Sequence, residues 1–85
     1  MENETITYGN VSFEVVQVGS IVKVIDYDNR VAVGVVEEKK ETIQNKSVGV
    51  RFGFGDEDIT YVIIEQKQTK GQPMYTLLEI VRSYV

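Results

Sequence analysis

Short apolar segments alternate with turn-forming residues at even intervals along the chain. This rhythm is typical of an antiparallel sandwich or barrel rather than of a helical protein. A high content of valine, whose β-branched side chain suits a pleated surface, points the same way. The segments expected to be strands are Thr5–Tyr8, Val11–Val18, Ile21–Ile25, Val31–Val35, Val48–Phe54 and Thr60–Glu65. The predicted fold is therefore mainly β, a small antiparallel barrel of about five to seven strands, in a single domain over residues 1–85.

Three of these segments carry further information. In Val48–Phe54, apolar residues alternate strictly with Gly and Arg, which is the clearest strand pattern in the chain. Ile21–Ile25 is apolar on both faces except at Lys23, which predicts a central strand. The valines of Val31–Val35 share one face, and the small Ala32 and Gly34 between them predict a close backbone approach or a bend.

Polar stretches separate the strands. Asp26–Asn29 is predicted to form a turn, since Asp and Asn bond their own main chain and tolerate a left-handed backbone. Glu37–Lys46 is the longest polar stretch and is interpreted as a hairpin loop, with a turn at Asn45–Ser47, into which the flanking strands can extend. Gly55–Asp58 is expected to be an acidic turn, and Lys67–Gln72 a polar one.

The C-terminal segment has two interpretations. Met74, Leu77, Leu78 and Val81 follow helical spacing, and Pro73 suits a first helical turn. This spacing favours a short helix or helical turn. The alternative is a terminal strand that closes the barrel, because Tyr75, Thr76 and Ile80 are residue types that favour strands.

The composition excludes much chemistry. The chain has no Cys and no His, so it lacks disulfides, thiolate metal sites and the commonest general base. We expect no enzyme activity, no metal and no cofactor. Nine basic residues against thirteen acidic ones, a net charge of −4, make duplex DNA an unexpected partner. Without a signal-peptide pattern or a membrane-length apolar run, a cytoplasmic protein with no membrane partner is expected.

Phe52 and Phe54 share one side of their strand, with Arg51 beside them. Aromatic rings with a nearby cation can stack bases of single-stranded nucleic acid. The other interpretation places Val48, Val50, Phe52 and Phe54 in one core stripe, and this is favoured. The neighbouring glycines fit bends or bulges better than a phosphate-binding loop, because the spacing required by the known loop motifs is absent.

The stretch Val18–Ile64 resembles small barrels of the Tudor and Src-homology type. The resemblance rests on three runs and an acidic turn: Gly19–Val24, Val33–Glu37, Val48–Phe52 and Gly55–Asp58. It implies peptide binding by aromatic side chains beside loops, here Tyr27, Phe52, Phe54 and Tyr61. The chain has no Trp, which argues against proline-rich ligands. A second resemblance, of Asp28–Gly34 to a turn and glycine-containing strand, is to Sm-like barrels.

The function hypothesis is a non-catalytic protein-interaction module: an adaptor, inhibitor or small subunit, of a kind that phages and mobile elements encode. The acidic runs Glu37–Glu38 and Asp56–Asp58 suit a partner with a basic surface. One alternative is single-stranded nucleic-acid binding on Phe52 and Phe54, and another is a small ligand at an oligomer interface. A homodimer would follow if a valine-rich edge strand paired between copies. The candidate binding residues are Tyr27, Arg51, Phe52, Phe54, Asp56, Glu57, Asp58 and Tyr61.

Overall fold

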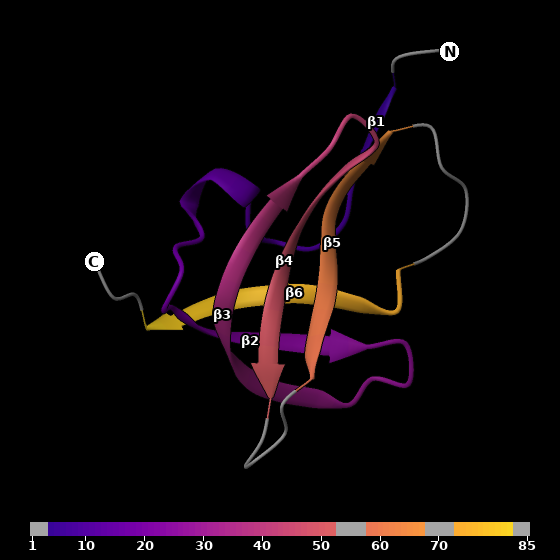
Figure 1. The fold of residues 1–85 in the computed structure, drawn as a ribbon. Coiled ribbons are helices and arrows are strands. Elements are labelled where there is room, and N and C mark those ends of the chain that lie inside the picture. The colour runs from indigo at the N-terminus through magenta and orange to yellow at the C-terminus, as the bar shows by residue number, and fades with distance from the viewer. Residues whose placement is uncertain (1–3, 53–57, 68–72, 83–85) are drawn as a thin grey trace.

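A computed structural model describes residues 4–52, 58–67 and 73–82 of the chain (Figure 1). These residues form six strands and one short 3-10 helix, so the mainly β prediction is confirmed. In chain order the elements are β1 (Thr5–Thr7), η1 (Phe13–Val15), β2 (Ile21–Asp26), β3 (Val31–Glu41), β4 (Asn45–Phe52), β5 (Ile59–Lys67) and β6 (Tyr75–Arg82).

All six strands belong to one antiparallel sheet with the order β1-β5-β4-β3-β2-β6. The sheet coils on itself, so that β4 and β5 lie crosswise over β2 and β6 (Figure 1). Within the described chain no ladder joins the edge strands β1 and β6, and the predicted closure into a barrel is not confirmed. After β1, Tyr8 N–H donates to Ile64 O of the neighbouring β5 at 2.9 Å, and Asn10 N–H donates to Leu77 O of the edge strand β6 at 3.2 Å.

β3 belongs to both layers of the coiled sheet. Its first half pairs with β2 over Val31–Val35, and its second half pairs with β4 from Gly34 onward. Gly34 therefore lies where the strand passes from one layer to the other. A Cβ atom at this position would lie 2.5 Å from Val50 Cγ1 and 2.8 Å from the Arg51 carbonyl oxygen. Only glycine allows this approach, in agreement with the close contact or bend predicted for this segment.

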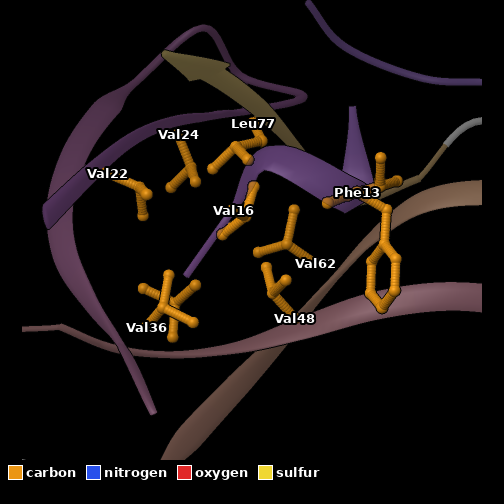
Figure 2. Packing of buried hydrophobic residues seen from close by; sticks show 10 residues of the cluster. Phe13, Val16, Val22, Val24, Val36, Val48, Val62 and Leu77 are labelled. Carbon is orange, nitrogen blue, oxygen red and sulfur yellow. The ribbon is translucent and has the colours of Figure 1, made fainter. Parts of the chain in front are cut away.

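The core lies between the two layers and is built mainly from valine (Figure 2). Each strand from β2 to β6 contributes inward-facing side chains that are almost completely buried. η1 adds Phe13, and Val16 follows directly after it, so this segment covers the core from a third side. The ten core residues are Phe13, Val16, Val22, Val24, Val36, Val48, Val50, Val62, Ile64 and Leu77.

The strand predicted over Val11–Val18 is wrong. The segment contains η1, in which Phe13 is buried while Val15 remains 55% exposed. Phe13 and Val16 are three residues apart, which is one turn of a 3-10 helix, and both therefore point into the core. An alternating pattern at Val11, Phe13 and Val15 concealed this spacing.

The polar stretch Glu37–Lys46 is mostly strand rather than loop. β3 continues to Glu41 and β4 begins at Asn45, so the turn predicted at Asn45–Ser47 is wrong. The real turn is closed by Thr42, whose N–H donates to Asn45 O at 2.8 Å and whose hydroxyl accepts from Asn45 N–H at 3.0 Å. These strand ends have polar sequences because much of their length is exposed to water on both sides.

The predicted C-terminal helix is also wrong, because Tyr75–Arg82 forms β6 and pairs with β2. Leu77 lies opposite Val24 and Ile80 opposite Val22, so the four residues from Leu77 to Ile80 span the three residues from Val22 to Val24. A β-bulge at Leu78 absorbs the extra residue. The bulge leaves the inward-facing residues three apart, and this spacing imitates a helix in the sequence.

The turn predicted at Asp26–Asn29 is confirmed. Asn29 N–H donates to Asp26 O at 2.9 Å, and Asn29 has a left-handed backbone with φ of 66°. The Asp26 carboxylate accepts the N–H groups of Arg30 at 3.0 Å and Asp28 at 2.9 Å. The hydrogen bond from the Arg30 backbone is the main reason why the pKa of Asp26 is lowered. The predicted turn at Lys67–Gln72 and most of the one at Gly55–Asp58 lie outside the described residues.

Substitution of Gly34 tests the passage of β3 between the layers. Gly34→Ala should lower the free energy of unfolding by about 2 kcal/mol or more, because the new methyl group meets the β4 backbone. Ala32→Val, which adds carbon at an exposed position of the same strand, should change it by less than about 0.5 kcal/mol. Chemical denaturation measures both. Equal stability of Gly34→Ala and the wild type would contradict the close approach.

Candidate functional site

The candidate site lies on the outer face of the layer formed by the second half of β3 with β4 and β5. A second β-bulge shapes it, since Val36 lies opposite Val50 but Glu38 lies opposite Gly49. The bulge inserts Glu37 as an extra residue. Both glutamates reach side chains on the outer face: Glu37 Oε2 accepts from Arg51 Nε at 3.1 Å, and Glu38 Oε2 accepts from the Tyr61 hydroxyl.

Gly49 forms the floor of the site. A Cβ atom there would lie 2.7 Å from Ile59 Cγ2, 3.0 Å from Glu38 Cγ and 3.2 Å from Tyr61 Cε1. These side chains of β3 and β5 therefore close over the bare backbone of β4, and Gly49 is buried although it faces outward. The missing side chain is what allows Tyr61 and Glu38 to meet across β4.

Tyr61 is the central aromatic residue of the site and remains 45% exposed. The hydrogen bond from its hydroxyl to the Glu38 carboxylate is the main reason why the pKa of Tyr61 is raised. Lys40 Nζ lies 5.3 Å from the centroid of the Tyr61 ring, within the range of a cation–π contact. Tyr61 thus contacts the Glu38 carboxylate through its hydroxyl group and the Lys40 ammonium group through the face of its ring.

Arg51 and Glu37 form the other half of the site. Their side chains are each 37% exposed, so the ion pair adds little to stability but fixes two opposite charges on the sheet surface. Asp58 is exposed and directly precedes Ile59, which pairs with Arg51. We call Glu37, Glu38, Lys40, Arg51 and Tyr61 the acidic–aromatic face.

Of the predicted site residues, Arg51 on β4 and Tyr61 on β5 face the same outer side of the sheet, Asp58 directly precedes β5, and two others lie elsewhere. Tyr27 is 67% exposed on the turn between β2 and β3. Phe52 packs against the core, with its ring centroid 6.4 Å from that of Tyr75. Phe54, Asp56 and Glu57 lie outside the described residues.

Arg51 and Phe52 therefore point to opposite sides of β4, and the structure does not bring this cation and this ring together. The favoured interpretation of Phe52 as a core residue agrees with its packing. Lys40 and Gly49 were missed as site residues. The signal for Gly49 was present in the sequence, as a glycine within a strictly alternating strand.

A second group of charges covers η1 on the other side of the layer. Lys39 Nζ and Lys46 Nζ lie 4.4 Å and 5.8 Å from the centroid of the Phe13 ring. Lys46 also lies 2.9 Å from Glu14 and 3.8 Å from Glu65. The contact between Lys46 and Glu14 is the main cause of the lowered pKa of Glu14 and the raised pKa of Lys46. This group holds η1 over the core and is structural.

An open groove of about 720 Å³ lies beside the tip of the β3–β4 hairpin. It is lined mainly by polar and charged side chains, including Glu41, Lys46 and Lys67, and Ile43 is the large apolar residue at its rim. Small-molecule pockets are mostly apolar, so this groove is a poor match for them. Over residues 4–52, 58–67 and 73–82, no cluster of acidic side chains is suited to hold a metal ion. In the same residues, no helix is long and apolar enough to cross a membrane.

The Tyr61–Glu38 contact can be tested by titration. Glu38→Gln should lower the pKa of Tyr61, because the acceptor loses its charge. The contribution of this contact to stability should be complete below the ordinary tyrosine pKa and be lost as the pH rises through the raised one. Ultraviolet difference titration against Tyr61→Phe isolates this residue. Glu37→Gln is the matched control and should leave the titration unchanged, whereas an unchanged titration in Glu38→Gln would contradict the contact.

No family model matches this chain, and neither a curated protein nor a solved structure matches it. The resemblance to Tudor-type and Src-homology-type barrels stays a prediction from the sequence. The chemistry of the acidic–aromatic face is therefore the basis for assigning a function to this protein.

Proposed function

We propose that this protein is a non-catalytic interaction module that binds a basic segment of a partner protein on the acidic–aromatic face. The observation that carries the proposal is the position of Lys40, whose ammonium group lies over the Tyr61 ring. A lysine or arginine of a partner can take the same place, with the ring face of Tyr61 and the Glu38 carboxylate as its ligands. The resemblance to peptide-binding small barrels supports the same class of function.

The arrangement suits recognition of a pattern of charges rather than a single charge. Glu38 and Tyr61 together form a contact point that is anionic and aromatic. Beside it, Arg51 and Glu37 form an ion pair with no net charge. Each group is already held by a neighbour across the sheet, so little side-chain freedom remains to be lost on binding. A partner with a basic side chain above Tyr61 and a polar one above Arg51 would meet both positions.

The net charge of −4 adds a long-range attraction for a basic partner. Binding should therefore weaken as salt is added, since exposed charges are screened over about 10 Å at moderate ionic strength. The same salt dependence is expected for binding of nucleic acid, so salt dependence alone does not identify the partner class. The partner class is identified by whether the captured molecule is a protein or a nucleic acid.

Affinity capture from native extract tests the proposal with two matched variants. Tyr61→Ala removes the ring of the acidic–aromatic face, and Tyr27→Ala removes an exposed tyrosine from the β2–β3 turn. Wild type and Tyr27→Ala should capture the same stoichiometric protein with a basic surface, and Tyr61→Ala should lose at least about tenfold in affinity, equal to 1.4 kcal/mol.

Three results would contradict the proposal. One is the absence of a stoichiometric protein partner, and another is a partner that Tyr61→Ala retains in full. The third is capture of single-stranded nucleic acid in place of protein, which would favour the alternative function. Circular dichroism of each variant shows that loss of binding is not loss of folding.

A further inference from the structure

The side chain of Lys40 reaches from β3 across β4 to the ring of Tyr61 on β5. Lys40 pairs with Ser47 of β4, and Tyr61 pairs with Gly49, two residues further along the same strand. β4 carries a small residue at both positions, and neither has a side chain long enough to separate β3 from β5. The Lys40 ammonium group therefore lies over the Tyr61 ring, 5.3 Å from its centroid.

Lys40 is held more weakly than the basic side chains of the neighbouring β4. Arg51 lies 3.1 Å from Glu37, and Lys46 lies 2.9 Å from Glu14. Among the residues that the structure describes, no carboxylate forms an ion pair with Lys40, which is exposed. A cation–π contact at an exposed site changes an equilibrium by about two- to fivefold, so the Lys40 ammonium group can leave the ring readily.

We propose that Lys40 is a built-in competitor, which occupies the position above Tyr61 in the free protein and must leave before a basic partner segment binds there. This inference rests on the proposed function, because it assigns the same ring face to the partner's cation. Two ammonium groups cannot share this position, since like charges at such a short distance repel each other. The chain's own lysine thus closes the site, and the movement of one side chain opens it.

Competition by Lys40 makes the site selective for segments that offer more than one contact. Exchange of Lys40 for a partner's lysine replaces one cation–π contact with another, so the ring alone contributes no net affinity. The tether to β3 also gives the Lys40 ammonium group a local concentration of about millimolar or more, which a single free cation would have to match. A partner's cation gains in the exchange where it also contacts the Glu38 carboxylate, with which Lys40 forms no ion pair in the described chain.

NMR of the Lys40 side chain tests the competition directly. The ring current of an aromatic side chain shifts protons above its face to lower frequency. The ε-methylene protons of Lys40 should therefore be shifted in the free protein and take the ordinary lysine value in Tyr61→Ala. Addition of an oligolysine peptide to the wild type should also return them to that value, because Lys40 leaves the ring. An unshifted resonance in the free protein, or one that stays shifted when the peptide saturates Tyr61, would overturn the inference.

Removal of the competitor should strengthen binding. Lys40→Gln should bind the oligolysine peptide about two- to fivefold more tightly than Lys39→Gln in isothermal titration calorimetry. Lys39→Gln is the matched control, because it makes the same change of charge one residue away. The ammonium group of Lys39 lies over Phe13 instead, so the comparison removes the general effect of charge on affinity. Equal affinities of the two variants would refute the competition.

These results separate the inference from the proposed function. If the peptide binds in a Tyr61-dependent manner while Lys40 stays on the ring, the competition is refuted and the proposed function stands. If the peptide binds neither to the wild type nor to Lys40→Gln, both are contradicted. Circular dichroism shows whether each variant folds. Should Lys39→Gln unfold, Lys67→Gln at the exposed end of β5 makes the same change of charge and takes its place as the control.

Discussion

The passage of β3 through both layers at Gly34 is the constraint on which the rest of the structure depends. Val50 Cγ1 and the Arg51 carbonyl oxygen lie 2.5 Å and 2.8 Å from the point where a Cβ atom of residue 34 would be. Because glycine leaves this point empty, β4 can follow β3 around the bend. The sheet then coils over itself and encloses a core, and within the described residues neither a second sheet nor a long helix contributes to it. The outer side of the sheet follows the same coil, from β2 through Val35 to Arg51 on β4.

Among the irregularities in strand pairing, the bulges in β3 and in β6 at Leu78 connect the fold with the proposed function. The bulge in β3 brings both Glu37 and Glu38 to the outer face, where they meet Arg51 and Tyr61. The bulge in β6 keeps Leu77 and Ile80 directed toward the core while the strand follows the curved β2. In each case an irregularity in strand pairing determines which side chains face the core and which face solvent.

The sequence was sufficient for elements with regular alternation and insufficient where the period changes. The strand predicted from Val48, which is part of β4, the Asp26–Asn29 turn and the close approach at Gly34 all follow from local chemistry. The helix predicted in place of β6 is wrong because the bulge leaves the inward-facing residues three apart, as in a helix. The strand predicted in place of η1 is wrong because a single 3-10 turn is too short to establish a helical period. The contact between Tyr61 and Glu38 depends on strand register, which the sequence alone does not fix.

The most direct test of this account is a backbone-amide NMR titration of the labelled protein with a lysine-rich peptide. We expect saturable chemical-shift changes at Glu37, Glu38 and Tyr61, with none at Val31, which lies at the start of β3 and pairs with Ile25 of β2. The changes should disappear in Tyr61→Ala. Changes centred on Val31 and Val33, or changes that do not saturate, would contradict the assignment of the acidic–aromatic face as the binding surface.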